Sequence, residues 1–285
     1  MSLIKTEELG YFVGGFVGEG LDHPECVSAG KDGEAYAGGE EGQVYRIDTN
    51  DKTFNQLGST GAFVGGIAQD GQGSVYCCCG PDIVKMTKDG KTSSYPVSGN
   101  SGLELANYPV FDGKGNLYVS DSGEWKNDSG KIFRVTPNGK IDIWSEQITT
   151  FPNGMALDPS GQYLYVVASL NTPRVERLKI NEDGSSGKTE NVVSLPGTVP
   201  DGLAWDTQGN LYISCYTPSR IYRLAPSGKL EILAEDPEHT MLASPTNIAF
   251  CGSNRDILLS ANLGRWHITE IMTGVTGIPL NYPVI

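Results

Sequence analysis

The chain has 285 residues, 38% of them apolar, and a formal net charge of −13 at pH 7. This composition can bury a sizeable core, and the absence of a linker-like stretch predicts a single domain over residues 1–285. The acidic balance disfavours nucleic acid and anionic membrane surfaces as partners, because both are recognised through cationic patches. It is compatible with cation binding, although most of these carboxylates are expected only to keep the protein soluble.

The N-terminus lacks a basic start followed by an apolar run, and no apolar segment approaches the length of a membrane span. A soluble, cytoplasmic protein is therefore expected. Three of the six cysteines are consecutive, at positions 77–79, and a strand would point adjacent side chains to opposite faces. A disulfide framework is thus excluded, and Cys26, Cys215 and Cys251 are expected to be small buried thiols in a reducing compartment.

A short pattern returns six times along the chain, and one position within it identifies each copy. That position is occupied by Glu25, Gly65, Asn107, Asn153, Asp201 and Asn247, which we call the phased residues. Subtracting successive numbers gives separations of 40, 42, 46, 48 and 46 residues. Glycine follows the first five positions by eight residues, and tyrosine follows four of them by eleven. A period of this length is typical of a solenoid or a propeller.

Each unit is predicted to contain four short strands separated by turns rich in Gly, Pro, Asn and Asp. In the third unit the expected strands are 108–111, 117–119, 131–135 and 141–144, and in the fifth they are 203–205, 211–214, 220–224 and 230–233. No segment longer than about ten residues has sustained helical periodicity, so the chain is expected to be all-β. Four-stranded units of this size are typical of the blades of a propeller.

The pattern therefore predicts a six-bladed β-propeller with four-stranded blades around a central channel; a pair of stacked sandwiches is the alternative. Closing the ring requires an edge to be paired. We expect the segment from Tyr11 to Phe16 to share a blade with the strands after Asn247. Pro279 and Pro283 make the extreme C-terminus a poor strand.

The first strand of every blade lines the channel, so the phased positions should converge there. Glu25, Asn107, Asn153 and Asp201 would then supply two carboxylates and two carboxamides, an oxygen-only set that suits a hard cation such as calcium. Gly65 would leave a gap for water or ligand. The alternative is that these residues cap tight turns, but Glu25 is too long for that role.

Four segments carry a further signal through their order and spacing. They are Gly18-Glu-Gly20 followed by Pro24-Glu25, Phe151 to Gly161, Pro200 to Gly209, and Pro245 to Gly252. With them the chain resembles the six-bladed family of gluconolactonase, regucalcin (senescence marker protein) and luciferin-regenerating enzyme. The resemblance covers most of the sequence.

This resemblance implies a divalent cation, usually calcium, held by a Glu from the first blade, an Asn from the fourth and an Asp from the fifth. Those roles fall on Glu25, Asn153 and Asp201, and an Asn from the third blade that touches metal, water or substrate falls on Asn107. Zinc, manganese and iron(II) are alternative ions. The implied reaction is hydrolysis of a lactone or related ester, in which Asp201 is the candidate base or nucleophile.

The chain also departs from the family. Members that cleave sugar lactones tend to carry an Arg-x-Asn-Asp run in the third blade, where this chain has Leu105-Ala-Asn107-Tyr108. The metal site is therefore better supported than a polyhydroxylated sugar-acid lactone as substrate. Substrate contacts are predicted for Asn107, Tyr108, Asp121 and His267, the last two because loops between second and third strands open at the same end of the channel as the phased residues.

Two functions from other classes remain as alternatives. One is a calcium-binding or small-molecule-binding propeller without turnover, because a fold does not fix a function. The other is a propeller like strictosidine synthase, which performs a condensation without this metal. The presence of both Glu25 and Asp201 argues against the second.

Overall fold

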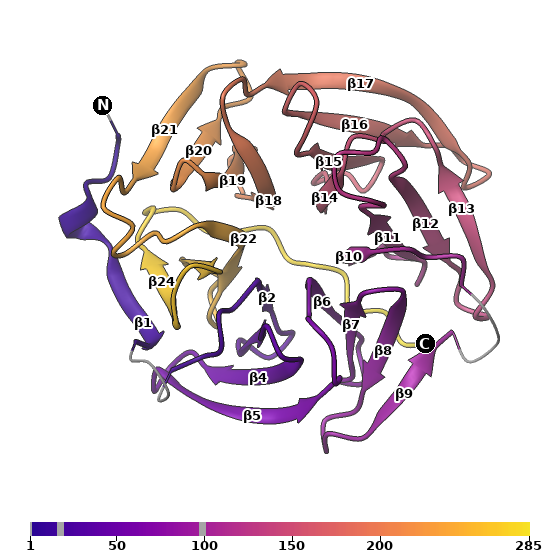
Figure 1. The fold of residues 1–285 in the computed structure, drawn as a ribbon, viewed down its shortest axis with the longest axis horizontal. Helices are drawn as coiled ribbons and strands as arrows, with labels where there is room; N and C mark the ends of the chain where they lie inside the picture. Colours follow the sequence, from indigo (N-terminus) through magenta and orange to yellow (C-terminus); the bar gives the residue numbers. More distant parts are fainter. Residues whose placement is uncertain (1, 16–19, 97–100) are drawn as a thin grey trace.

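The computed structural model describes residues 2–15, 20–96 and 101–285. Within them lie one 3-10 turn, η1 (Thr6–Glu8), and six four-stranded antiparallel sheets arranged radially around a channel (Figure 1). The predicted six-bladed all-β propeller is thus confirmed. That a single domain extends over all of residues 1–285 stays a prediction.

Each blade takes four strands in the order of its sheet. The first three are β2 (Cys26–Ala29), β3 (Ala35–Gly38), β4 (Gln43–Asp48), β5 (Thr53–Ser59); β6 (Gly66–Gln69), β7 (Val75–Cys79), β8 (Asp82–Met86), β9 (Thr92–Tyr95); and β10 (Ala106–Phe111), β11 (Leu117–Asp121), β12 (Lys131–Val135), β13 (Ile141–Ser145). The third blade therefore has its strands where they were expected, with β10 and β11 each extended by two residues and β13 by one.

The remaining blades repeat this plan. They are β14 (Pro152–Leu157), β15 (Tyr163–Ala168), β16 (Arg174–Ile180), β17 (Ser186–Ser194); β18 (Val199–Trp205), β19 (Leu211–Thr217), β20 (Arg220–Leu224), β21 (Leu230–Glu235); and β22 (Pro245–Cys251), β23 (Ile257–Asn262), β24 (His267–Ile271), β1 (Gly10–Gly14). The innermost strands are β2, β6, β10, β14, β18 and β22. We call the end of the channel where these strands begin the proximal end, and the other the distal end.

In blades two, three and five, the repeated Asp, Gly and Tyr of the sequence pattern build the turn at the distal end of the inner strand. Asp206 Oδ1 accepts the backbone N–H groups of Gln208 (2.9 Å) and Asn210 (2.8 Å), and Asp206 Oδ2 accepts the hydroxyl of Tyr212 (3.0 Å). Gly209 has a φ of +80°, a conformation that side chains other than glycine rarely adopt. This turn explains why the pattern recurs, and it leaves the phased residue at the opposite end of the strand free for another role.

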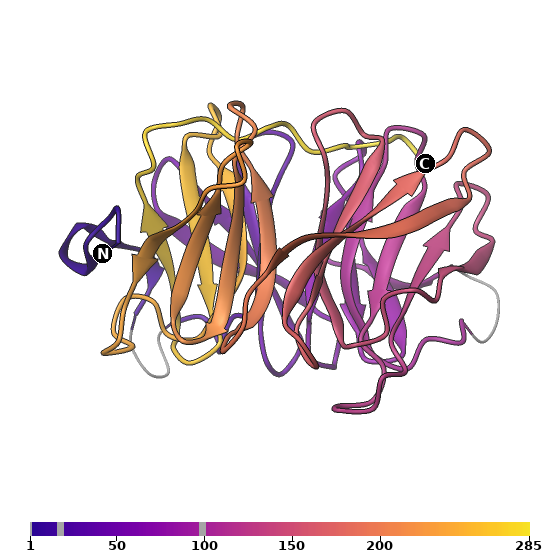
Figure 2. The ribbon, with the colours of Figure 1, turned by 90° about the horizontal axis from the view of Figure 1, so that it is seen from above.

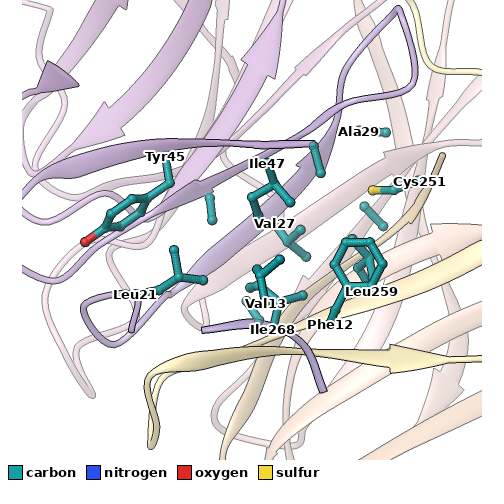
Figure 3. Packing of buried hydrophobic residues seen from close by; sticks show 14 residues of the cluster. Phe12, Val13, Leu21, Val27, Ala29, Tyr45, Ile47, Cys251, Leu259 and Ile268 are labelled. Carbon is teal, nitrogen blue, oxygen red and sulfur yellow. The ribbon is translucent and has the colours of Figure 1, made fainter. Parts of the chain in front are cut away.

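The ring is closed in the sixth blade by strands from both halves of the chain. β1 pairs antiparallel with β24, as expected for the segment that starts at Tyr11; Phe16 lies outside the described residues. The blade packs on the first blade through a buried cluster that includes Phe12, Val27 and Leu259 (Figure 3). The N-terminal strand therefore holds the propeller shut by hydrogen bonds and by apolar packing.

The C-terminal segment after β24 forms no strand and crosses the distal end of the channel (Figures 1 and 2). Ile278 N–H donates to Trp205 O (3.1 Å), the amide of Asn281 donates to Phe111 O (3.0 Å), and the hydroxyl of Tyr282 donates to Ala29 O (3.1 Å). This strap, residues 276–285, thus links blades five, three and one, and its lack of a strand agrees with the expectation from Pro279 and Pro283.

Two further expectations concern the cysteines and the membrane. All six cysteines lie in the described part of the chain, and each is a buried free thiol, as expected. Among the described residues, no helix has the length and apolarity needed to cross a bilayer.

Candidate functional site

The phased residues stand at the proximal ends of the six inner strands. We call the five that carry side-chain oxygen atoms, Glu25, Asn107, Asn153, Asp201 and Asn247, the polar ring. In blades three to six, the pairing of the inner strand with its neighbour skips a register at this point, between 106 and 108, 152 and 155, 200 and 203, and 245 and 248. Such bulges re-aim a side chain without ending the strand. The local irregularity thus coincides with the residues singled out by the repeat.

Asp201 lies at the centre of the contacts among these side chains. The amide of Asn153 donates to Asp201 Oδ2 (3.1 Å), and the amide of Asn247 donates to Asp201 Oδ1 (3.1 Å). Because a carboxylate only accepts, both amides are oriented with their carbonyl oxygens away from Asp201. Both oxygens of one carboxylate are therefore held by carboxamides from the two adjacent blades.

Four oxygen atoms of the polar ring are buried and lack a hydrogen-bond partner. They are Glu25 Oε2, Asn107 Oδ1, Asn153 Oδ1 and Asn247 Oδ1. Buried polar atoms normally have a partner, and an unpaired one costs roughly 1–3 kcal/mol. Four such atoms in equivalent places of a repeat are available to accept a donor or to bind a cation.

A series of hydroxyl groups links neighbouring blades around the ring by hydrogen bonds. Each hydroxyl donates to a backbone carbonyl of the next blade, at or next to a polar-ring residue. The bonds run from Ser122 to Pro152 O (2.8 Å), from Ser169 to Pro200 O (2.7 Å), from Ser214 to Thr246 O, and from Thr246 to Glu25 O (2.5 Å). The positions of the ring residues are therefore fixed from one blade to the next.

Glycines allow the inner strands to approach closely at this level. A Cβ atom on Gly202 would lie 2.7 Å from Asn247 Cα, and one on Gly65 would lie 2.9 Å from Asn107 O. The prediction that Gly65 leaves a gap for water or ligand is therefore corrected. The missing side chain makes room for the backbone of the next blade, which occupies that space.

Burial controls the electrostatics of the two carboxylates. Glu25 is 6% exposed and Asp201 is 4% exposed. Burial raises the pKa of Asp201 to about 7, against the lowering effect of the Asn153 and Asn247 amides. The pKa of Glu25 is raised well above its ordinary value, first by burial and then by the charge of Asp201. A nearby cation would have the opposite effect and would lower the pKa of both groups.

Asp121 and Tyr108 lie beside the ring in different ways. Both oxygens of the Asp121 carboxylate accept backbone N–H groups, from Leu105 at 2.7 Å and Glu104 at 2.9 Å, so the residue fixes the segment that leads to Asn107. Tyr108 is buried, packs with Tyr118 and lines a cavity towards the distal end. Their roles as substrate contacts stay predictions.

His267 lies at the start of β24, two strands away from the inner strand of the sixth blade. It is 1% exposed; its Nε2 is 3.0 Å from Met241 O and its ring packs edge-on against Tyr11 at 4.3 Å between centroids. Burial lowers its pKa. The structure places it among packing residues and outside the polar ring, and its contact with substrate stays a prediction.

Asn247 is the residue that the sequence analysis identified by phase but did not assign to the site. Its position in the sixth copy of the repeat could have identified it, although that copy has neither the glycine nor the tyrosine that follow in other copies.

A second group of three possible ligand residues lies outside the ring: Asp22, His23 and Glu40, whose ligand atoms lie within 4.8 Å of one another. There His23 Nδ1 is 3.3 Å from Asp22 Oδ1 and 3.2 Å from Glu40 Oε2, and all three side chains are accessible to solvent, so these polar atoms have partners within the group.

A cavity of about 1180 Å³ occupies the distal part of the channel. Its lining includes residues that follow the ring along the inner strands, among them Tyr108, Met155, Leu203 and Ile248, and it also includes Ile278 to Tyr282 of the strap. Among the residues that the structure describes, the five ring side chains are not part of this lining. This cavity is thus separate from the candidate ligands.

Comparison with known proteins relates this chain to a family. The family model described as the SMP-30/Gluconolactonase/LRE-like region matches residues 31–261. A lactonase, drp35, of Staphylococcus aureus (strain MRSA252) is 29% identical over 163 residues, which cover 54% of this chain and 50% of that protein. The chain therefore spans about half the length of the curated relatives it matches.

Two solved structures share the fold at low identity. The luciferin-regenerating enzyme has a TM-score of 0.78 at 18% identity, covering 96% of this chain and 100% of that one. A regucalcin from Agrobacterium tumefaciens, described as a calcium-binding protein, has a TM-score of 0.77 at 16% identity, covering 100% of this chain and 99% of that one. Similarity at this level establishes the fold alone. Of the segments that carry the family resemblance, Gly18 and Glu19 lie outside the described residues.

Proposed function

Because the chain belongs to the SMP-30/Gluconolactonase/LRE-like family, we propose that it is a divalent-cation-dependent hydrolase of lactones or related esters. Calcium is the proposed ion, held by Glu25, Asn153 and Asp201, with Asn107 in contact with the ion, water or substrate. The observation that carries the proposal is the set of four unpartnered buried oxygen atoms around the Asp201 carboxylate. The names of the relatives, a lactonase and a gluconolactonase, support the reaction class.

The donor chemistry fits a hard cation. Carboxylate and carboxamide oxygens are the ligands that calcium prefers, and the set contains neither sulfur nor imidazole, the ligands typical of zinc and copper sites. Burial raises the pKa of both carboxylates, the charge of Asp201 raises that of Glu25 further, and a bound cation would favour their ionised forms. The residues therefore fit the proposed ion, with manganese, zinc and iron(II) as the alternatives to test.

The bound ion would polarise the carbonyl of the lactone and lower the pKa of a water molecule. The chain's own contribution is to orient the acid that handles the proton. Asn153 and Asn247 hold both oxygens of Asp201 at 3.1 Å, so this carboxylate is fixed before substrate arrives. We propose that Asp201 takes the proton of the attacking water at one of these oxygens and returns it to the leaving alkoxide.

Exposed aromatic residues at the proximal end favour a substrate with an apolar substituent. Phe63 lies between β5 and β6, Trp125 between β11 and β12, and Tyr216 at the end of β19, so all three stand at the end of the channel where the polar ring lies. They are 38%, 54% and 40% exposed. Together with Leu105 in place of the arginine of sugar-lactone-cleaving members, they offer apolar area and few partners for hydroxyl groups.

A cation-binding propeller without turnover is the second candidate. The observation that favours it is the burial of the ring, in which Asn247 is 0% and Asp201 4% exposed, together with a large cavity that these side chains do not line. Ligands so deeply buried can serve a structural ion as well as a catalytic one.

One experiment separates the two candidates. EDTA-treated protein is assayed for acid release from a panel of small-ring lactones, with calcium, manganese, zinc or iron(II) added back. The proposal expects turnover that depends on an added cation and is lost in Asp201→Asn. The matched control is Asp206→Asn, a buried turn acid in the same blade, which should retain turnover. Cation binding without turnover of any lactone favours the second candidate.

A further inference from the structure

Asn247 is more closely involved in the polar ring than the sequence around it predicts. It lies within the bulged start of β22, is 0% exposed, and donates its side-chain amide to Asp201 Oδ1 at 3.1 Å. This bond fixes the orientation of the carboxamide, because a carboxylate offers only acceptors. Its Oδ1 is left buried, and no side chain or backbone group of the described residues donates to it.

The backbone of this residue ties it to the other acid of the ring. Asn247 N–H lies 3.4 Å from Glu25 O, and the hydroxyl of Thr246 donates to the same carbonyl at 2.5 Å. On its other side, a Cβ atom on Gly202 would lie 2.7 Å from Asn247 Cα. Asn247 is therefore packed between the strands that bear Asp201 and Glu25, the two carboxylates of the ring.

A structural asparagine in the same blade has a different pattern of contacts. Asn262 is also 0% exposed, but its Oδ1 accepts Ala243 N–H at 2.9 Å, and its amide donates to His267 O at 3.1 Å and Thr269 Oγ1 at 2.9 Å. Every polar atom of that side chain is used. Asn247 uses one side only, which is what a ligand residue would do before its ion is bound.

We propose that Asn247 is a further residue of the cation site: its amide orients Asp201, and its Oδ1 is a direct ligand of the ion. The inference rests on the proposed function in that it requires a cation in the polar ring. It adds a contribution from blade six, so that the ion would be held by ligands from blades four, five, six and one. Because it concerns binding, it can be tested without turnover.

The test compares Asn247→Leu, Asn247→Asp and the control Asn262→Asp in EDTA-treated protein titrated with calcium chloride at fixed pH. Binding is measured by calorimetry, and melting is followed with and without calcium. Asn247→Leu, which removes both functions at similar volume, should weaken calcium binding at least tenfold, because losing a ligand or its support typically costs that much.

Asn247→Asp should have a signature that a packing role would not give. A third carboxylate in the ring should lower the melting temperature without calcium and should enlarge the shift caused by calcium beyond that of the unmodified protein. Asn262→Asp should lower the melting temperature without enlarging the calcium shift, because no cation is proposed there. The gain in calcium response keeps the test decisive if Asn247→Leu does not fold.

Two results would overturn the inference, and they differ from each other. If the unmodified protein binds calcium and both Asn247 variants bind it with the same affinity, Asn247 is not a ligand, and the proposed function is unaffected. If the unmodified protein binds none of calcium, manganese, zinc and iron(II), the cation site itself is absent, and both proposals fail.

Discussion

The two ends of the central channel are built from the same six inner strands, yet they differ in chemistry. At the proximal end the strands present carboxylates and carboxamides, packed so closely that glycines are needed between them. A few residues further along, the same strands present Tyr108, Met155, Leu203 and Ile248 to a cavity of about 1180 Å³ that the strap crosses. The cavity and the unpartnered oxygen atoms of the polar ring therefore lie at opposite ends of the same strands.

The largest expected effect comes from the acid at the centre of the proximal end. Asp201→Asn should lower kcat/KM for a lactone at least a thousandfold, in the range found when a general base is removed. The fold should survive, because the substitution removes a buried charge. Lactone hydrolysis and thermal melting measured together check this. An active Asp201→Asn variant would show that the proximal end is not the site of the chemistry.

The pH dependence of stability should differ between protein with and without calcium. The pKa of Asp201 is about 7 in the folded chain and about 3.9 in an unfolded one. A raised pKa gives stability that is fully present below about pH 4 and lost as the pH rises through 7. Melting temperatures in EDTA should therefore fall between pH 5 and pH 8 by more than they do in calcium.

The control for this pH experiment is Asp201→Asn in EDTA, which lacks the titrating group. Its melting temperature should change less between pH 5 and pH 8 than that of the unmodified protein. Equal slopes for the two proteins would mean that other groups, and not the carboxylates of the polar ring, set the pH dependence.

A smaller effect is expected at the aromatic residues of the proximal end. Trp125→Ala should raise KM several-fold for a lactone with an aromatic substituent, because roughly 25 cal/mol is lost for each Å² of apolar contact. KM for an unsubstituted small-ring lactone should be unchanged. Ile143→Ala, at an exposed apolar position on β13, is the control. A preference of tenfold or more for glucono-lactone in the unmodified protein would contradict this view of the substrate.

The smallest effect on the site is expected from the distal end. Tyr282→Phe removes the hydroxyl that donates to Ala29 O and should cost about 1 kcal/mol of stability. Calcium affinity and turnover should stay the same, since the strap contacts the distal end of the inner strands. A calcium affinity that changed with this variant would show that the two ends are coupled.

The sequence predicted much of the fold because the repeat is local. In blades two, three and five the turn is made by an Asp, a Gly and a Tyr within a few residues, so their spacing gives the strand boundaries; the predicted range 220–224 matches β20. The shared position of the phased residues within the repeat also predicted which side chains lie close together. The bulges at the ring were not predictable, because they depend on pairing with the second strand and on hydroxyl groups from the neighbouring blade.

Other parts of the site required the three-dimensional structure. That Gly65 makes room for the backbone of Asn107 follows from the approach of two blades, and no sequence pattern encodes that distance. The burial of His267 against Tyr11 depends on β1 joining β24 across almost the whole chain. Pro279 and Pro283 predicted that the C-terminus is not a strand, but not that it crosses the channel.

The closure of the ring has a consequence for the order of events during synthesis. Glu25 and Asn247 are 222 positions apart (247 − 25), yet Asn247 N–H lies 3.4 Å from Glu25 O. A nascent chain that has emerged only as far as blade five leaves β1 without β24 and leaves the polar ring incomplete. A ligand that contacts Asn247 as well as Glu25 would therefore favour the finished propeller over forms that lack the last blade. Binding of such a ligand would thus stabilise the protein only once blade six has formed.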